Sequence, residues 1–344
     1  TWSFSMADGA FKVAVFMGGV STEHEVSLRS GAGVIRALRA MGHTPIPVQI
    51  DKNGAWSLND RVFDEPLAAC AHLKTLCPDC VFIALHGGFG EDGHIQALLD
   101  WIDMPYTGSG SMACGLALDK VRAKAVAQSA GVPVSRHVAF DARSWRGDQS
   151  EAWRLVHDVV GFPCVIKAPC QGSSVGLAMC PDETHLTGHV EQILPIEGRV
   201  MIEQYIAGRE LTCAVLDASE DGSLLPLPLT EIRPKRAAWF DYEAKYTPGA
   251  CDEITPAPVD EDARCRIAEL AVLAHEALGC AGWSRSDFIL REDGTPVWLE
   301  LNTVPGLTET SLFPQAAAAA GISYELLVDL FVRDAIRRGI RRGR

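Results

Sequence analysis

Apolar and polar positions in the first part of the chain follow two alternating periods. The run KVAVFM (12–17) is apolar, rich in valine and followed by two glycines, which predicts a strand. Apolar positions from 26 to 39 recur at helical spacing, and TPIPVQID (44–51) is again extended. CVFIAL (80–85) has the continuous apolar character of a buried strand, and residues 96–101 are predicted to be helical. Alternating strands and helices are typical of a parallel sheet.

Two glycine-rich stretches in this region each follow a predicted strand. They are GGVSTEHEVS (18–27) and HGGFGEDG (86–93). Ligands of parallel sheets gather at the carboxyl ends of the strands, so both stretches are expected near a binding site. YTGSGS (106–111) then breaks the pattern. We therefore predict a first, Rossmann-like unit over residues 6–108.

The rest of the chain divides into two further predicted units, residues 109–199 and 200–344. The second contains a loop rich in glycine and serine, and the third combines strands with one long helix. The elements predicted here are a helix at 111–129, strands at 164–168, 177–180, 200–205, 211–216, 286–290 and 297–302, and a helix at 261–278. From about residue 234 to 258 the residues follow no period, which in a compact enzyme predicts a lid or a disordered segment.

The overall composition argues against several classes of protein. Asp and Glu outnumber Lys and Arg by 44 to 31, and an acidic chain lacks the basic surface that a nucleic-acid partner needs. No apolar run reaches the length of a membrane span, and TWSFSMADGA has no basic leader before an apolar stretch, so neither a membrane nor a signal peptide is expected. The 11 cysteines show no framework spacing, and the CxxC at 77–80 has no second pair, which favours reduced thiols in the cytoplasm.

The stretch WLELNTVPG (298–306) carries a candidate metal site. Glu300 and Asn302 are two residues apart in an apolar strand, so their side chains point to the same face. Arg285 and Asp287 repeat this spacing in the preceding strand, and the intervening REDGTP has the Asp-Gly signal of a hairpin. Oxygen-bearing side chains on one face suit magnesium bound together with phosphates. The alternative is a salt-bridge network on a solvent-facing sheet, but the bulky apolar neighbours and the Pro-Gly turn favour the metal site.

A phosphate-binding loop is indicated in the second unit. The pattern GxxxxGK[ST] occurs nowhere in the sequence, which excludes a Walker loop. QGSSVG (171–176) follows Lys167 between two strands, and its small residues allow backbone N–H groups and hydroxyls to surround phosphate oxygens. EHEVS (23–27) is a separate signal, because helix capping explains only one of the two glutamates that flank its histidine.

These stretches resemble, together and in order, the motifs of the D-alanine–D-alanine ligases, a family of ATP-grasp enzymes. The resemblance rests on GGVSTEHEVSLRSG, HGGFGEDG, PYTGSG, DK, VIKAPCQGSSVG, EAKY, GWSRSDF and LELNTVPGLTETSL, and it runs from Val13 to Gly321. It implies an α/β chain in which two small α+β domains hold ATP between them, preceded by a Rossmann-like domain with a parallel sheet. The second and third predicted units would form the grasp.

The resemblance also implies the positions that bind the nucleotide and its metal. Lys120 and Lys167 would contact the phosphates, Glu203 would read the edge of the adenine, and Glu210 would bind the ribose. The other implied ATP-binding positions are Ser173, Ser174, Gln204, Tyr205 and Ile206. Two Mg²⁺ ions, replaceable by Mn²⁺, would be bound by Asp287, Glu300 and Asn302.

The reaction of the family joins two D-alanine molecules through an acyl phosphate. Glu23 resembles the glutamate that binds the ammonium of the first substrate, and Ser173 and Tyr246 resemble the residues that link with it to close the lid. Arg285 and the N–H of Gly306 would form an oxyanion hole. The pocket for the second substrate would be lined by His86, Lys245, Ser311 and Leu312.

Several alternatives stay open. The second substrate would be D-lactate or D-serine in a sibling enzyme, although the tyrosine of EAKY favours D-alanine because lactate-forming relatives alter the lid there. A second alternative is an ATP-binding protein without ligase chemistry. A third is a ligase for L-amino acids, and the stretches EHEVS and HGGFGEDG argue against it. Relatives are commonly dimers, so a cytoplasmic homodimer that supplies peptidoglycan precursors is expected. Glu309 has no predicted role.

Overall fold

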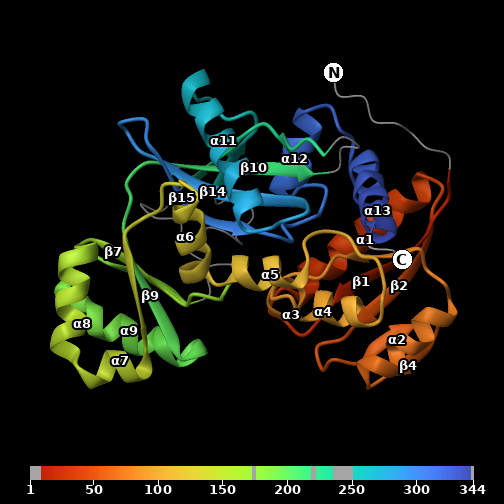
Figure 1. The fold of residues 1–344 in the computed structure, drawn as a ribbon, viewed down its shortest axis with the longest axis horizontal. Helices are drawn as coiled ribbons and strands as arrows, with labels where there is room; N and C mark the ends of the chain where they lie inside the picture. The colour runs from red at the N-terminus through yellow and green to blue at the C-terminus, as the bar shows by residue number, and fades with distance from the viewer. Residues whose placement is uncertain (1–8, 173–175, 218–221, 235–250, 342–344) are drawn as a thin grey trace.

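The computed structural model describes residues 9–172, 176–217, 222–234 and 251–341 (Figure 1). Within these ranges the strands form three sheets. Figure 1 shows the sheet nearest the N-terminus on the right, the middle sheet with its helices on the left, and the C-terminal sheet between and above them. This arrangement places the second and third sheets on either side of α6 (Lys120–Ser129).

The first sheet confirms the predicted parallel α/β unit. β1 pairs in parallel with β2 and with β5, and the strand order is β4-β3-β2-β1-β5. Valine-rich β1 is buried because helices pack on both faces of the sheet. β3 and β4 add an antiparallel edge hairpin that the sequence pattern did not reveal. The elements are β1 (Lys12–Gly18), α1 (His24–Ala40), β2 (Thr44–Ile50), β3 (Trp56–Leu58), β4 (Arg61–Phe63), α2 (Pro66–Thr75), β5 (Cys80–Ile83), α3 (Gly88–Glu91) and α4 (His94–Trp101).

The second sheet is antiparallel and contains a strand that the sequence pattern assigns to the third unit. Its order is β6-β9-β7-β8, and β9 (Arg199–Gln204) pairs with both β6 and β7. The boundary predicted between residues 199 and 200 therefore falls inside β9, because an apolar run does not reveal which sheet it joins. The other elements are β6 (His137–Asp141), α7 (Ala142–Gly147), α8 (Gln149–Leu155), the π-helical η1 (Val156–Val160), β7 (Cys164–Lys167), β8 (Leu177–Cys180) and α9 (Glu183–Glu197).

The third sheet carries the predicted hairpin. The order is β13-β12-β10-β14-β15, with β11 paired to β10. The end of the segment predicted to be a lid is a strand instead, since β13 pairs antiparallel with β12. The elements are β10 (Arg209–Asp217), β11 (Leu225–Pro226), β12 (Thr230–Pro234), β13 (Cys251–Ile254), α11 (Glu261–Ala277), β14 (Gly282–Leu290), β15 (Pro296–Asn302), α12 (Leu312–Ala319) and α13 (Tyr324–Arg341).

The helix predicted over 111–129 is broken into α5 (Ser111–Leu118) and α6. Asp119 lies between them in an extended conformation, and its carboxylate accepts the N–H of Arg122 at 3.2 Å as the N-cap of α6. The apolar residues of α6 pack with Trp298 and Leu301 of β15. The break thus starts a new helix at Lys120, which is one of the predicted phosphate ligands.

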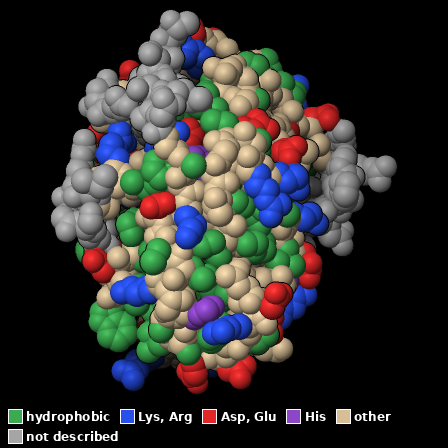
Figure 2. All heavy atoms as spheres, turned by 90° about the vertical axis from the view of Figure 1, so that its right-hand side faces the viewer, with side chains coloured by type: hydrophobic (Ala, Val, Ile, Leu, Met, Phe, Trp, Pro, Cys, Tyr) green, Lys and Arg blue, Asp and Glu red, His purple; other side chains and the backbone are tan. Residues whose placement is uncertain are grey.

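The first and third sheets share one hydrophobic core. Trp283 of β14 packs on Phe331 of α13, with ring centroids 3.8 Å apart. The ring centroid of Phe82 of β5 lies 6.1 Å from that of Trp283. The space-filling view in Figure 2 shows acidic and basic side chains interspersed on the face that it presents, without a continuous basic surface. Among the described helices none is by itself long and apolar enough to cross a membrane, and only the bent pair of α12 and α13 meets that test jointly.

Candidate functional site

The acidic face predicted on the hairpin is present. Asp287 lies opposite Glu300, and Arg285 lies opposite Asn302 in the β14–β15 ladder. The Arg285 guanidinium donates through Nε and Nη2 to the two oxygens of Asp287, both at 2.8 Å. The Asn302 Nδ2 is 3.4 Å from Asp287 Oδ2. A salt bridge does form, but its side chains are only 12% and 10% exposed, so this is not the solvent-facing network of the alternative interpretation.

Lys120 connects this face to the second unit. Its Nζ lies 3.1 Å from Glu300 Oε2 and donates to the carbonyl of Gln171 at 2.8 Å. A pocket opens at this junction. The residues that line it are Glu91, Ala117, Leu118, Lys120, Gly172, Glu300, Leu301, Asn302 and Thr303. The pocket therefore brings together part of the acidic face, a predicted phosphate ligand, the start of the glycine-serine loop and one residue of the first unit.

Lys167 and Glu203 form a second ionic cluster. In the β7–β9 ladder Glu203 lies opposite Val165, and Lys167 lies opposite Met201. Alternate residues of a strand share a face, so Lys167 and Glu203 project from the same side of the sheet. The Lys167 Nζ forms an ion pair with Glu203 Oε1. The structure thus pairs a predicted phosphate ligand with the predicted adenine acceptor.

Lys124 completes this cluster, and sequence reasoning missed it. Its ammonium lies 3.2 Å from Glu203 Oε2 and donates to Ser135 Oγ at 3.0 Å. Ser135 Oγ in turn donates to Glu203 Oε2 at 2.7 Å. A lysine in a helix is normally exposed, yet the side chain of Lys124 is fully buried. Only its position four residues after Lys120, on the same face of α6, indicates a related role.

The cluster shifts the pKa values of its members. Burial alone would raise the pKa of Glu203, but Lys124 and Lys167 outweigh it and hold the pKa well below its ordinary value. Burial lowers the pKa of Lys124, and the attraction of Glu203 offsets this only in part. Burial also acts to lower the pKa of Lys167, but Glu203 and Glu300 outweigh it and raise the pKa. Glu203 is therefore a carboxylate held between two cations.

The other predicted nucleotide positions lie beside this cluster. Glu210 is on β10, and its charge also acts to raise the pKa of Lys167. The N–H of Gln204 donates to Arg136 O at 2.8 Å. The N–H of Tyr205 donates to Pro163 O at 3.3 Å, and Ile206 follows it directly. The roles expected of these groups toward ATP stay predictions.

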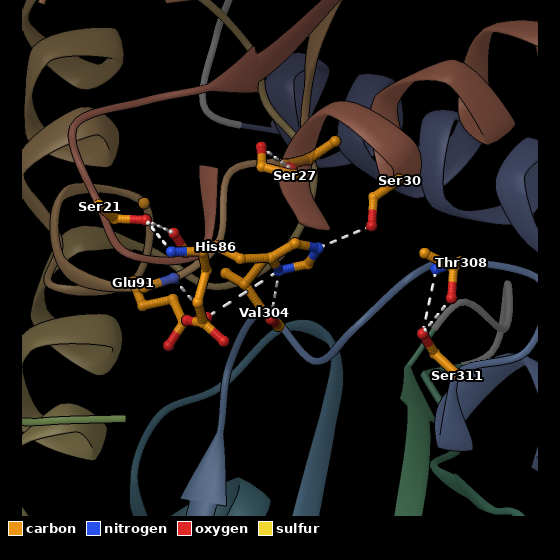
Figure 3. Close-up of polar contacts among 12 residues, drawn as sticks. Ser21, Ser27, Ser30, His86, Glu91, Val304, Thr308 and Ser311 are labelled. Atoms are coloured by element: carbon orange, nitrogen blue, oxygen red, sulfur yellow. Dashed lines mark hydrogen bonds and ion pairs between the residues drawn. The ribbon is translucent and has the colours of Figure 1, made fainter. Parts of the chain in front are cut away.

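His86 lies where the first unit meets the loop after β15 (Figure 3). Its Nε2 is 2.8 Å from Ser30 Oγ, and its Nδ1 is 3.3 Å from the carbonyl oxygen of Val304 and 4.0 Å from Glu91 Oε1. Burial lowers the pKa of His86, although Glu23 acts to raise it. A proton on Nδ1 lets the neutral ring donate to Val304 and accept from Ser30.

Glu91 lies beside His86 and is a second residue that sequence reasoning missed, although it is part of HGGFGEDG. Its Oε1 accepts the N–H of Gly87 at 3.0 Å. Gly87 has φ +69°, and a Cβ there would lie 2.7 Å from Glu23 Oε2, so glycine allows Glu23 to approach the loop. Burial, helped by Glu23, raises the pKa of Glu91 to about 7. Glu23, His86 and Glu91 thus surround one corner of the site.

Gly306 and Ser311 meet in the loop after β15. A Cβ on Gly306 would lie 2.9 Å from Ser311 Oγ, which accepts the N–H of Thr308 at 3.1 Å. Figure 3 shows this Thr308–Ser311 pair. Ser311 is the N-cap of α12, which starts at Leu312, and a helix N-terminus favours a bound carboxylate. Glu309 pairs with Arg36 of α1 at 3.0 Å, which accounts for its position.

Four predicted site residues lie outside the described residues. They are Ser173 and Ser174 of the glycine-serine loop, and Lys245 and Tyr246 of the predicted lid. The eleven cysteines all lie within the described residues, where every one is a free thiol. Among the described residues no group of three or more His, Cys, Asp or Glu side chains could hold a metal ion, so the CxxC at 77–80 gains no support as a zinc site.

Comparison with protein families gives two matches that together cover most of the chain. The model described as "D-ala D-ala ligase N-terminus" matches residues 12–76 and 69–109, and "D-ala D-ala ligase C-terminus" matches residues 126–333. A D-alanine–D-alanine ligase of Halalkalibacterium halodurans is 39% identical over 328 residues, which cover 95% of this chain and 100% of that protein. One of Desulforudis audaxviator is 40% identical over 328 residues, covering 95% and 99%.

Solved structures with a similar fold bear related descriptions. The VanG D-Ala:D-Ser ligase of Enterococcus faecalis has a TM-score of 0.79 at 29% identity, covering 95% of this chain and 100% of that one. The D-alanine–D-alanine ligase of Bacillus anthracis complexed with ATP has a TM-score of 0.79 at 27% identity, covering 97% and 100%. The likeness extends over all three sheets.

Proposed function

The chain belongs to the D-alanine–D-alanine ligase family, and from this premise we propose that it joins two D-alanine molecules into D-alanyl-D-alanine while converting ATP into ADP and phosphate. One observation carries the proposal: the pocket where Lys120, Glu300 and Asn302 meet Glu91 of the first unit. Phosphoryl transfer to an amino acid requires a nucleotide-binding and a substrate-binding surface to meet. Both surfaces contribute to this pocket.

ATP would lie between the second and third sheets. Lys120 and Lys167 supply positive charge toward its phosphates, together with the loop that carries Ser173 and Ser174. Glu203 would accept from the amino group of the adenine. The remaining nucleotide contacts that we propose are Gln204, Tyr205 and Ile206 at the base and Glu210 at the ribose.

The hairpin face fits Mg²⁺, with Mn²⁺ as a substitute. Asp287 and Glu300 offer carboxylate oxygens at facing positions, and Asn302 adds a carboxamide oxygen. Glu300 and Asn302 are open to the pocket. Hard oxygen donors and room for phosphates are what Mg²⁺ prefers. Bound Mg²⁺ would neutralise negative charge on the transferring phosphoryl group.

In the first step, the carboxylate of one D-alanine attacks the γ-phosphate, which yields D-alanyl phosphate and ADP. Glu23 would bind the ammonium of this substrate and would link with Ser173 and Tyr246 to close the site. In the second step, the amine of the other D-alanine attacks the acyl carbon, and phosphate leaves. Arg285 and the N–H of Gly306 would stabilise the oxyanion of the tetrahedral intermediate.

The second substrate would bind beside α12. Ser311 and Leu312 at the N-terminus of this helix, with Lys245, would hold its carboxylate, and His86 would line the pocket. The VanG neighbour makes D-serine a specific second candidate for this position. D-lactate is the third.

Release of phosphate, followed in the presence of ATP and Mg²⁺ with D-alanine, D-serine and D-lactate in competition, tests the proposal. We expect turnover that requires D-alanine and yields mainly D-alanyl-D-alanine. Faster turnover with D-lactate at neutral pH would refute this specificity. Binding of ATP without any phosphate release that depends on D-alanine would favour a nucleotide-binding protein instead.

The wider setting is proposed on the same basis. The product would serve as a precursor of bacterial peptidoglycan, made in the cytoplasm by a homodimer. The units at 6–108, 109–199 and 200–344 would act as substrate-binding, central and C-terminal domains, with the second boundary moved past β9.

A further inference from the structure

Lys167 has two roles that it cannot fill at the same time. As a phosphate ligand its ammonium must lie at the triphosphate, but in the structure it forms an ion pair with Glu203 Oε1. That oxygen belongs to the carboxylate proposed to accept from the adenine amino group. While the ion pair persists, the Lys167 ammonium occupies the Glu203 oxygen that the adenine amino group needs as its acceptor.

Lys124 is fully engaged, because its three N–H groups all have acceptors. It donates to Ser135 Oγ at 3.0 Å and to the Trp298 carbonyl at 3.2 Å, and it lies 3.2 Å from Glu203 Oε2. Its side chain is 0% exposed and lies over the Trp298 ring, 5.7 Å from the centroid. An ammonium has three donors, so Lys124 has none left for a phosphate. It is a fixed counter-ion of Glu203.

Lys167 is placed to exchange partners. It ends β7 and is separated by three residues from the glycine-serine loop, and its side chain is 11% exposed. The charges of Glu203 and of Glu300, a residue of the pocket, both act on its ammonium, so Lys167 is within electrostatic reach of both carboxylates. If Lys167 moves toward phosphate, Lys124 and Ser135 still compensate the charge of Glu203 through Oε2.

We propose that Lys167 and Glu203 form a latch over the base site, which the phosphates of the nucleotide open by drawing Lys167 away from Glu203. Opening exposes Oε1 to the amino group of the adenine, while Lys124 holds the other oxygen as a positioning residue. This inference rests on the proposed function, since it takes ATP as the ligand. It couples recognition of the base to the presence of the phosphates.

The coupling predicts opposite effects of one substitution on two ligands. Adenosine has no phosphate to attract Lys167, so it must compete with the ammonium for Glu203. Lys167→Met should therefore bind adenosine about three- to tenfold more tightly than the wild type, because the acceptor is vacated. The same variant should bind ADP at least about tenfold more weakly, because a phosphate contact is lost. A lysine that only contacts phosphate would leave adenosine unchanged.

The experiment is a titration of wild type and Lys167→Met with ADP, adenosine and inosine, by calorimetry and ligand-observed NMR. Inosine is the matched ligand, because its 6-oxo group accepts hydrogen bonds and gains nothing from a vacated carboxylate. Lys120→Met is the matched variant, since Lys120 pairs with Glu300 and should lose ADP affinity with adenosine unchanged. Adenosine affinity in Lys167→Met equal to or below that of the wild type, or an equal gain for inosine, would overturn the latch.

The role of Lys124 is tested separately. Lys124→Met should lose adenosine affinity selectively over inosine, and its thermal midpoint reports whether it folds. If it does not fold, Ser135→Ala removes one of the groups on Glu203 Oε2 and should weaken adenosine about threefold, again with inosine unchanged. Equal losses for both nucleosides would overturn the positioning role. Failure of the wild type to bind ADP at all would instead refute the proposed function.

Discussion

Asp287 lies directly opposite Glu300 across the β14–β15 ladder, and Arg285 occupies both oxygens of Asp287. Like charges at facing positions of a sheet repel each other unless cations compensate them. Arg285 and Lys120 provide that compensation, the latter at 3.1 Å from Glu300. The face is thus a balanced cluster whose positive and negative groups both suit a metal-bound phosphate.

Replacing Arg285 tests its role in the transition state. We expect Arg285→Ala to lower kcat by about 10²- to 10³-fold, as loss of an oxyanion-hole donor does, with ADP affinity largely retained. Phosphate release that depends on D-alanine gives the first quantity, and calorimetry with ADP gives the second. Arg291→Ala is the control, because Arg291 pairs with Asp293 in the exposed hairpin turn. Unchanged turnover in Arg285→Ala would remove it from the oxyanion hole.

Replacing Glu23 tests the binding of the first substrate. Glu23→Gln keeps the shape of the side chain but loses the charge that would face the substrate ammonium. The KM for the first D-alanine should rise at least about tenfold, with much less effect on the KM for ATP. Glu25→Gln, two residues along, is the matched control, because Glu25 forms an exposed ion pair with Lys52. Equal effects of Glu23→Gln on both KM values would indicate a purely structural role.

The raised pKa of Glu91 predicts how stability depends on pH. Burial, helped by Glu23, raises this pKa from 4.5 to about 7, so the folded state binds the proton more tightly than the unfolded chain. The contribution of Glu91 to the free energy of unfolding is therefore largest below about pH 4.5 and falls until about pH 7, by about 3 kcal/mol at most. Glu91→Gln keeps an acceptor for the Gly87 N–H but cannot titrate.

Urea unfolding of wild type and Glu91→Gln at about pH 5 and about pH 8 checks this prediction. The variant should gain stability relative to wild type as the pH rises. Asp92→Asn is the control at the adjacent carboxylate, which accepts the N–H of His94. A difference between wild type and Glu91→Gln that is the same at both pH values would contradict the raised pKa.

Among the described residues, a buried hydrogen bond of His43 with Asp329 and an exposed ion pair of Arg36 with Glu309 join the first unit to the third, and they should differ in their contribution to stability. His43 Nδ1 accepts the N–H of Phe11 at 3.1 Å, so the ring proton is on Nε2, which donates to Asp329 Oδ1 at 2.8 Å. The side chains of His43 and Asp329 are 0% and 1% exposed. Asp329→Ala leaves a buried donor without this acceptor, and should cost about 2–4 kcal/mol.

The matched control is Glu309→Ala at the other pair. The side chains of Arg36 and Glu309 are 65% and 61% exposed, so this substitution should cost about 1 kcal/mol or less. Denaturant unfolding of both variants provides the comparison. Similar losses for the buried and the exposed pair would show that burial of the His43–Asp329 bond does not determine its contribution.

The sequence predicted those features that depend on local spacing. The two-residue period paired Arg285 with Asp287 and Glu300 with Asn302 on one face of each strand, and the Asp-Gly turn predicted the hairpin that the structure confirms. A register shift next to Asp287 places Glu300 opposite it, where the register counted from the turn would place Leu299, and no local pattern predicts this shift. The parallel pairing of β1 with β2 and β5 likewise followed from the order of strands and helices. Within each strand, periodicity reports which side chains share a face, because that alternation is a property of the backbone.

Most of the features that the sequence did not reveal depend on contacts between distant segments. Lys124 is buried because Glu203, Ser135 and the Trp298 carbonyl surround it, and its spacing of four residues from Lys120 is the one local signal of such a site. β9 joins the second sheet through pairing with β6 and β7, which an apolar run cannot specify. Asp119 ends one helix and caps the next within a continuous helical pattern. Tertiary structure decided the burial of Lys124 and the pairing of β9, whereas the break at Asp119 is a local capping interaction within a helical pattern.

The most direct test of the central claim is a crystal structure with ADP and Mg²⁺ bound. We predict that the phosphates lie between Lys120 and Lys167 on one side and Asp287, Glu300 and Asn302 on the other, with a cation bridging the acidic face and the phosphates. A nucleotide bound elsewhere, or phosphates far from these three side chains and without a cation, would contradict the account.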